Sequence, residues 1–188
     1  MEDAHTPQDI QEALNKGSGT WLSPKPLKPA AVAVGKVTAS CRAVLDSWKG
    51  KFSFREGQRA TATDPTIPGL RRPQVGALHA ALAHITSSAD PATIVMPTGT
   101  GKTETMLAIY ANERFERLMV VVPTDALRDQ IAGKFETMGV LQDQECLARD
   151  AFYPIVLRLE HIPKSPEDVD ELFGRANVVV TTMSIAGK

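Results

Sequence analysis

The sequence predicts an α/β fold with a doubly wound, mostly parallel sheet from residue 70 onward. Three observations predict it. Short runs rich in valine and isoleucine, apolar almost without alternation, are typical of strands covered on both faces. Helical patterns separate these runs, and strands that alternate with helices imply right-handed crossovers between parallel strands. The composition agrees, since 43% hydrophobic and 23% charged residues are ordinary for a soluble globular protein.

Residues 1–69 are predicted to form an extension before this sheet. Thr6 and Pro7 favour the start of a short helix, with the threonine as cap. Proline fixes φ and removes a hydrogen-bond donor, so the proline-rich residues 17–29 are typical of a linker. The pattern over residues 37–48 is helical, and a loop is expected over Gly57 and residues 61–69.

Residues 70–188 are predicted to form a domain of alternating helices and strands. Val75, Leu78 and Leu82 recur at helical spacing, as expected for one buried helix face. Ser165 and Pro166 suit the cap and first position of a later helix. The predicted strands are 93–96, 118–122, 154–159 and 177–181, and the predicted helices are 73–85, 103–115, 125–138 and one opening at 165.

Charge and composition exclude several classes. The formal net charge is −1, whereas a protein built only to coat nucleic acid is usually strongly basic. The two cysteines, Cys41 and Cys146, lack any metal-like spacing, which favours a reduced chain in the cytoplasm. No apolar run approaches the roughly 18 residues of a membrane span, and no secretory signal follows Met1, so we expect no membrane partner.

A glycine-rich turn between the first predicted strand and the next helix predicts a phosphate-binding loop. Gly99 and Gly101 let the backbone approach phosphates without a Cβ in the way. The successive amides and the helix start favour an anion, and Lys102 is a point charge that reaches the outer phosphates. The Thr103 hydroxyl is placed to ligate Mg²⁺. The predicted nucleotide-binding residues are Thr98, Gly99, Thr100, Gly101, Lys102, Thr103 and Glu104, preceded by Met96 and Pro97.

One position departs from the strict pattern. The pattern starts with glycine four residues before the Gly-Lys pair, and this chain has Met96 there. The alternative is an ordinary strand-to-helix turn with an incidental lysine. Residue types, spacing and flanking periodicity agree on the phosphate loop, so nucleotide binding is the stronger interpretation.

Three further segments accompany this loop: Leu70-Arg71-Arg72-Pro73-Gln74, the run from Val121 to Gln130, and the run from Val178 to Ser184. Together they resemble the first RecA-like domain of superfamily-two helicases and translocases, in the group of DEAD-like helicases and restriction-enzyme motor subunits. The resemblance covers roughly residues 70–188. In that family the phosphate loop commonly begins with a residue other than glycine, so Met96 fits. The resemblance implies a P-loop NTPase of RecA-like fold with ATP and Mg²⁺ as cofactors.

The resemblance assigns adenine recognition to Gln74. A glutamine amide offers one donor and one acceptor, which suits the N6/N7 edge of adenine. The alternative is an exposed glutamine at a helix start. Arg71 or Arg72 could assist near the base or the phosphates, but adjacent arginines are more often a solvated patch.

The resemblance also implies contacts to a nucleic-acid backbone beyond the carboxyl ends of two strands, where ligands bind in open α/β sheets. Hydroxyls and helix-start amides there hold phosphates without reading sequence. The matching residues are Pro123, Thr124, Arg128, Thr181 and Thr182, together with Asp125. Because Asp125 would repel a phosphate, we favour a capping role for it. For Thr181 the alternative is a plain β-branched strand residue.

Two other groups of residues favour structural interpretations. His79 and His84 lie at i, i+5 on a helix, which is not the i, i+4 spacing of a metal pair. The acidic run Glu167, Asp168, Asp170 and Glu171 opens a helix, whereas the family's magnesium-binding acids follow a strand directly. We interpret it as a solvated helix face.

In the family, the acidic pair and a second RecA-like domain with its arginine finger would come after Thr182, and such a finger is worth about 10³–10⁵ in rate. The sequence therefore predicts a domain that is incomplete at its C-terminus, with little ATP turnover by these 188 residues alone.

The function implied for the intact protein is an ATP hydrolase of the helicase or translocase class. Its expected track is DNA or RNA, with DNA favoured by the restriction-like character of the Gln74 region, and other subunits of a restriction or defence complex would be partners. The alternatives are a non-catalytic nucleotide-binding adaptor and, more weakly, a small-molecule kinase. A GTPase is disfavoured because no Asn-Lys-x-Asp guanine-binding motif occurs.

Overall fold

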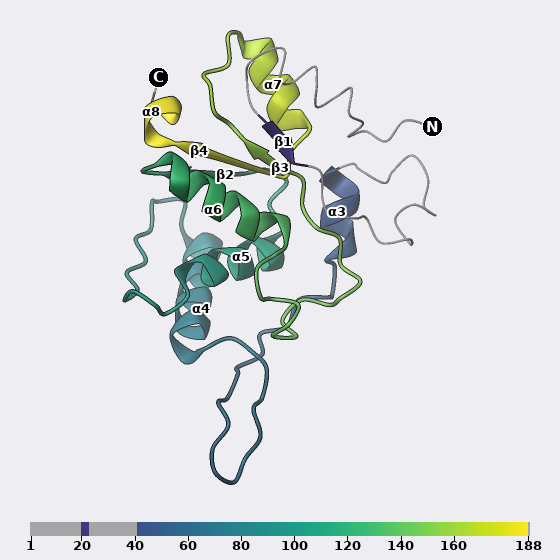
Figure 1. Cartoon of the computed structure of the whole chain (residues 1–188), viewed down its shortest axis with the longest axis vertical. Coiled ribbons are helices and arrows are strands. Elements are labelled where there is room, and N and C mark those ends of the chain that lie inside the picture. Colours follow the sequence, from purple (N-terminus) through teal and green to yellow (C-terminus); the bar gives the residue numbers. More distant parts are fainter. Residues whose placement is uncertain (1–19, 23–40, 188) are drawn as a thin grey trace. The chain divides into compact units, whose positions relative to one another are not determined.

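A computed structural model of the chain describes residues 20–22 and 41–187 (Figure 1). The chain divides into two compact units. The sheet unit consists of Met1–Ser47, Phe115–Met138 and Asp150–Lys188, and the loop unit consists of Trp48–Arg114 and Gly139–Arg149. Each unit therefore draws on segments that are far apart in the sequence.

The sheet unit contains a four-stranded sheet in the order β1-β3-β4-β2. The last three of these strands are parallel and β1 runs antiparallel to β3, so the predicted α/β fold with a parallel sheet is confirmed. Val122 lies opposite Thr182, which brings the carboxyl ends of β2 and β4 to one edge. The strands are β1 (Thr20–Leu22), β2 (Leu118–Val122), β3 (Val156–Arg158) and β4 (Val178–Thr182).

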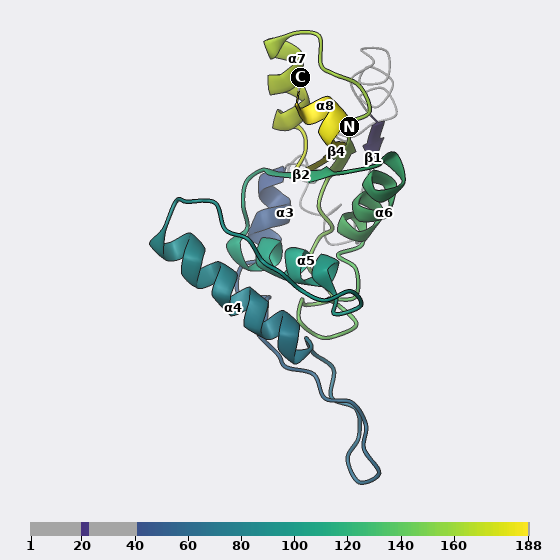
Figure 2. The ribbon, with the colours of Figure 1, turned by 90° about the vertical axis from the view of Figure 1, so that its left-hand side faces the viewer.

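Helices cover both faces of this sheet (Figures 1 and 2). In the view of Figure 1, α6 lies below the sheet and α7 above it. Ile131 and Phe135 lie one helical turn apart on α6 and are buried, as an amphipathic helix requires. On the other face, Leu157 and Val179 pack with Leu172 of α7. The helices of this unit are α3 (Cys41–Ser47), α6 (Asp125–Glu136), α7 (Pro166–Gly174) and α8 (Met183–Ala186).

The loop unit is built on α4 (Arg72–Ser87) and α5 (Lys102–Glu113), which pack side by side (Figure 2). Leu78 of α4 and Leu107 of α5 are fully buried. The ring of Trp48 meets that of Tyr110 edge to face, with 5.1 Å between centroids. These apolar contacts fix α5, and α5 in turn positions the glycine-rich loop before it.

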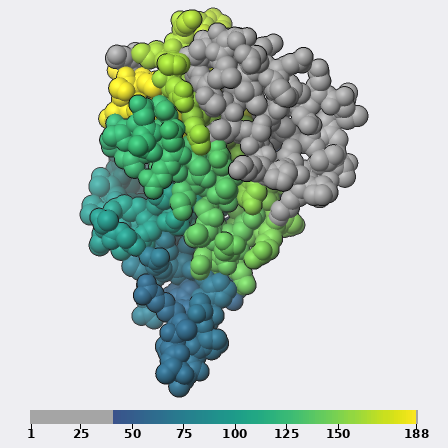
Figure 3. All heavy atoms as spheres, in the orientation of Figure 1, coloured from purple at the N-terminus to yellow at the C-terminus, as the bar shows by residue number. Residues whose placement is uncertain are grey.

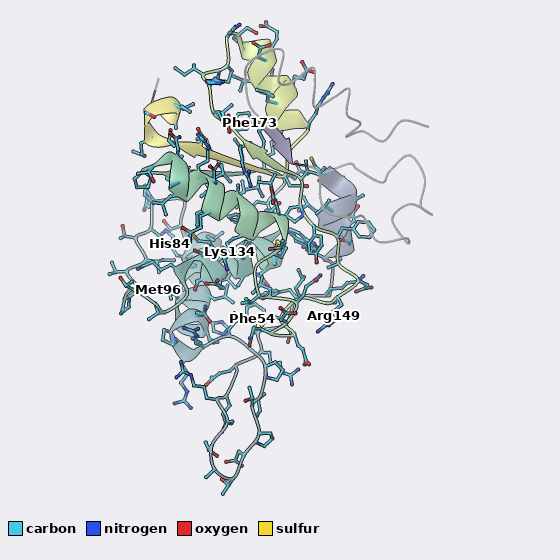
Figure 4. All side chains as sticks on the ribbon, in the orientation of Figure 1. Phe54, His84, Met96, Lys134, Arg149 and Phe173 are labelled. Carbon is cyan, nitrogen blue, oxygen red and sulfur yellow. The ribbon has the colours of Figure 1, made fainter. Side chains whose placement is uncertain are left out.

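Before α4 the chain forms an arm, residues 56–70, which stands out as the blue projection in Figure 3. Gln58 and Ile67 exchange two backbone hydrogen bonds of 2.9 Å across it. At its tip the Thr61 hydroxyl donates to Asp64. The predicted loop over these residues is thus a narrow ribbon without regular strands.

Most predicted elements are confirmed, with ends shifted by a few residues, and β2 has the predicted bounds. The predicted strand 93–96 is wrong. No other described segment forms a ladder with it, and a strand exists only where a neighbour accepts its hydrogen bonds. Ile94 and Val95 are exposed, and only Met96 is buried.

The predicted linker needs one correction, because its residues Thr20–Leu22 form β1. The ladder with β3 supplies the hydrogen bonds that local composition cannot reveal. The predicted helix 37–48 is confirmed over Cys41–Ser47. The short helix at Thr6, the rest of the linker and residues 37–40 lie outside the described residues.

Leu157→Ala should lower the free energy of unfolding by about 2–5 kcal/mol, because it leaves a cavity in the cluster between β3, β4 and α7. Urea denaturation followed by circular dichroism measures the loss. Val95→Ala is the control, because Val95 is 88% exposed and its truncation should cost under about 0.5 kcal/mol. Equal effects of the two substitutions would contradict the assigned core.

Candidate functional site

The glycine-rich loop has the backbone that a phosphate-binding turn needs. Gly99 has φ +81° and Gly101 has φ +90°, both in the left-handed region that favours glycine. A Cβ on Gly101 would lie 2.0 Å from the Nε2 atom of Gln74, so space as well as backbone angle excludes a side chain there. Two independent constraints therefore fix Gly101.

The start of α5 is open to an anion. Gly101 is its N-cap and has no side chain to accept a bond from the first amides, whereas the capped helices α6 and α7 have Thr124 and Ser165 in that place. Uncapped N–H groups at a helix start bind anions well. The loop itself is held by the Thr100 hydroxyl, which donates to the Pro97 carbonyl at 2.6 Å.

Gln74 lies against this loop and is buried. Its Nε2 donates to the Gly101 carbonyl at 3.1 Å, and its Oε1 accepts from the Arg71 amide at 2.8 Å. Arg71 in turn donates through Nη1 to the Gly99 carbonyl at 2.8 Å. The structure thus brings the start of α4 and the glycine-rich loop together.

A cleft of about 500 Å³ opens beside these residues, within the size range of small-molecule sites. The loop and α4 supply one side of it, and the arm supplies the other through residues such as Arg59 and Ile67. Gln144 also lines it and accepts a bond from the Gly69 amide at 2.9 Å. Its lining includes Gln74, Gly99, Gly101 and Glu104 of the predicted nucleotide-binding residues.

The remaining predicted nucleotide-binding residues do not line the cleft. Thr98 is exposed, Thr100 and Thr103 are half-buried, and Lys102 is exposed at the start of α5. Within the described part of the chain, no group of three or more His, Cys, Asp or Glu side chains could hold a metal ion. Thr103 is thus the metal candidate that the loop itself offers.

Sequence reasoning missed the contribution of the arm and of residues 139–149 to the cleft. The signal was weak, since Arg59, Ile67 and Gln144 belong to no motif. An ion pair between Arg55 and Glu145 and the bond from Gly69 to Gln144 join these distant segments. Both contacts depend on tertiary structure and leave no local pattern.

The carboxyl edge of the sheet gathers the predicted nucleic-acid residues. Pro123 and Thr124 are exposed there, directly after β2. Thr124 is the N-cap of α6, and its hydroxyl accepts from the Leu127 amide at 3.3 Å. Asp125 was expected to cap and does not, because it is the first residue of α6 and binds Arg128 instead.

Two predicted contact residues are not presented to solvent at this edge. The Arg128 side chain is 9% exposed and is paired with carboxylates. Thr181 is fully buried, and its hydroxyl donates to the Leu159 carbonyl at 3.1 Å. Thr182 is also buried, but its hydroxyl reaches the exposed Ser184 at 2.9 Å. In this structure the polar atoms of Arg128 and Thr181 are thus turned to partners within the chain.

The other singled-out side chains have structural roles. His79 stacks on Phe54, with 5.3 Å between ring centroids, and His84 binds the Asp90 carbonyl at 2.7 Å. In the acidic run, the amide of Glu167 and the Ser165 hydroxyl hold the pKa of the Glu167 carboxyl below its ordinary value. That run lies on α7, as the solvated-face interpretation expects.

The two cysteines are free thiols. Burial raises the pKa of Cys41 to about 11 and also raises that of Cys146. Both thiols stay protonated near neutral pH, and the thiol form is a weak nucleophile. The cysteines therefore take no part in the candidate site.

One unit thus holds a parallel sheet of the α/β class, and the other holds a positive-φ glycine loop at an uncapped helix start. Residues 67–158 match the family model described as "Type III restriction enzyme, res subunit". That family model describes a DEAD-like helicase superfamily 2 domain, a class of ATP-hydrolysing helicase-like enzymes. No curated protein and no solved structure matches the chain.

No helix among the described residues has both the length and the apolar character needed to cross a bilayer. The longest, α4, has 16 residues and carries exposed polar side chains.

Gly101→Ala should displace Gln74 and destroy the loop geometry, because the new methyl would strike the Gln74 amide. We expect a loss of stability of about 1–3 kcal/mol from the strained backbone. Gly76→Ala on α4 is the matched control, since nothing lies within 4 Å of its Cβ and alanine favours a helix. Thermal unfolding should show opposite shifts for the two variants, and a stabilised Gly101→Ala would refute the constraint.

Proposed function

We propose that this chain carries the Mg-ATP site and part of the nucleic-acid track of an ATP-dependent helicase or translocase. The observation that carries the proposal is the backbone of Gly99 and Gly101 at the uncapped start of α5, with Gln74 against it. The match to a helicase-like family supports the same class.

The glycine-rich loop would hold the phosphates of ATP. The amides at the start of α5 point along the helix axis toward the anion, and Lys102 adds a mobile positive charge. Thr103 would ligate Mg²⁺, which neutralises charge that develops on the transferring phosphoryl group. The exposed position of Lys102 suits a side chain that closes on a ligand.

The adenine would lie in the cleft beside Gln74. Gln74 lines a pocket of suitable volume, and its Nε2 and Oε1 each hold one bond within the chain, to Gly101 and Arg71. A side-chain amide also has a second N–H and a second lone pair, and these would pair with the base edge. The arm supplies the opposite side of that cleft through Arg59 and Ile67. These residues would add cationic and apolar contact to the base.

The carboxyl edge of the sheet would hold a nucleic-acid backbone. Pro123 and Thr124 are exposed there, and the Thr182 hydroxyl is joined to exposed Ser184. Neutral hydroxyls and helix-start amides contact phosphates irrespective of base sequence. We propose DNA as the track, restriction or defence subunits as partners, and residues 70–188 as the domain that follows an extension over 1–69.

Lys102→Ala should abolish the uptake of Mg-ATP that calorimetry detects in the complete protein, because the phosphates lose their main counter-charge. Arg149→Ala is the control, since it removes one exposed positive charge from the same unit and does not line the cleft. Unchanged uptake by Lys102→Ala would remove the assigned role. Lack of uptake by the unmodified protein would favour the adaptor alternative.

Thr124→Ala should weaken binding of a labelled oligonucleotide and also lower stability by about 1 kcal/mol, because the α6 cap is lost. Thr124→Ser keeps a hydroxyl and should restore both properties. Thr137→Ala is the matched control, since Thr137 is an exposed threonine at the other end of α6. Fluorescence anisotropy measures the affinity, and an affinity indifferent to salt would contradict backbone contact.

A further inference from the structure

Arg128 is an arginine enclosed by carboxylates. Its Nη1 lies 2.6 Å from Asp125, its Nη2 lies 3.5 Å from Glu160, and its Nε lies 3.6 Å from Asp129. The side chain is 9% exposed, whereas the Asp125 and Glu160 side chains are 75% and 37% exposed. The Nη1 contact with Asp125 is a hydrogen bond, whereas the buried Nε has no hydrogen-bond partner among the described residues. The guanidinium is thus held largely by ion pairs, behind acids that face solvent.

The network continues from Asp129 to β3. The Asp129 carboxylate also lies 4.0 Å from Nε of Arg158, and Arg158 pairs with Glu136 at 3.3 Å. Two arginines therefore face four carboxylates, so the cluster keeps a negative excess even when all pairs are formed. Each positive charge in it is needed to neutralise a carboxylate.

The partners of Arg128 lie on two segments of the proposed nucleic-acid edge. Asp125 and Asp129 belong to α6 itself, whose cap is Thr124, and Glu160 lies on the loop after β3, two residues beyond that strand. This loop is held from its other side as well, because the Thr181 hydroxyl of β4 donates to the Leu159 carbonyl. Through Glu160, Arg128 joins the first turn of α6 to the loop after β3.

We propose that Arg128 is a positioning residue that clamps the first turn of α6, which Thr124 caps, to the loop after β3 and screens the carboxylates there, so that Thr124 meets a phosphate in a fixed and less negative setting. This inference rests on the proposed nucleic-acid function of the edge. It replaces the interpretation of Arg128 as a phosphate contact.

Two physical effects give the clamp its consequence. A guanidinium with several carboxylate partners has fixed geometry, because its donors form a rigid planar fork. Its charge also offsets acids that would repel a phosphate at hydrogen-bond range from Thr124. Loss of Arg128 would free the loop after β3 from the first turn of α6. It would also leave the charges of Asp125 and Glu160 without their positive partner.

The experiment compares Arg128→Gln, Glu160→Gln and the double variant in the full chain. The probes are a labelled single-stranded DNA and its duplex, measured by anisotropy between about 50 and 200 mM salt. Arg175→Gln is the matched control, since Arg175 forms an ion pair of 3.0 Å with Glu171 in the same unit, outside the cluster. Hydrogen exchange of the amides of Leu127 and residues 160–164 is the second readout.

We expect Arg128→Gln to weaken binding roughly tenfold, the order of one lost charge-assisted interaction, because it removes both the clamp and the screening charge. Glu160→Gln removes the clamp but also one repelling carboxylate, so its affinity should fall less, and in the double variant hydrogen exchange should be little faster than in Arg128→Gln alone. The salt slope should not change, and the Leu127 amide and residues 160–164 should exchange faster in every variant. A direct phosphate contact would instead make the slope of Arg128→Gln shallower by about 0.7–0.9. That result, or unchanged exchange, overturns the clamp.

The two readouts separate this inference from the proposed function. If the unmodified chain binds neither the single-stranded DNA nor the duplex, the nucleic-acid function of the edge fails. Hydrogen exchange alone then decides whether Arg128 joins the first turn of α6 to the loop after β3. If Arg128→Gln does not fold, hydrogen exchange in Glu160→Gln tests the clamp, because the Glu160 side chain is partly exposed and tolerates the change.

Discussion

The carbonyl oxygen of Gly101 is the contact on which the candidate site depends. It accepts bonds from the Thr105 amide at 3.0 Å, the Thr105 hydroxyl at 3.1 Å and the Gln74 amide at 3.1 Å. A single peptide group therefore couples α4 to α5, and it belongs to Gly101, whose left-handed backbone caps the start of α5.

Elements whose signals are local were predictable from sequence. Ser165 before Pro166 marks the start of α7, because a capping hydroxyl and a proline suit the first turn of a helix. The valine-rich run at 118–122 marks β2, since β-branched side chains pack well on a pleated surface. The glycine-rich loop was predictable for the same reason, because glycine is the residue type that favours the positive φ angles found at Gly99 and Gly101.

Features that depend on a distant neighbour were not predictable in the same way. The segment 93–96 has the composition of a strand, yet the described residues give it no ladder, and Val95 remains exposed. Arg128 looks like a surface cation in the sequence, and only the placement of Glu160 reveals its burial. The arm joins the cleft through Gln144, which no local pattern indicates.

The division of the chain into interleaved units has a consequence for how the molecule forms. The chain passes from one unit to the other at residues 47/48, 114/115, 138/139 and 149/150. Neither unit is a continuous stretch, so no single cut liberates one of them as an autonomous fragment. Each unit must also close long loops before its own core is complete, which slows folding.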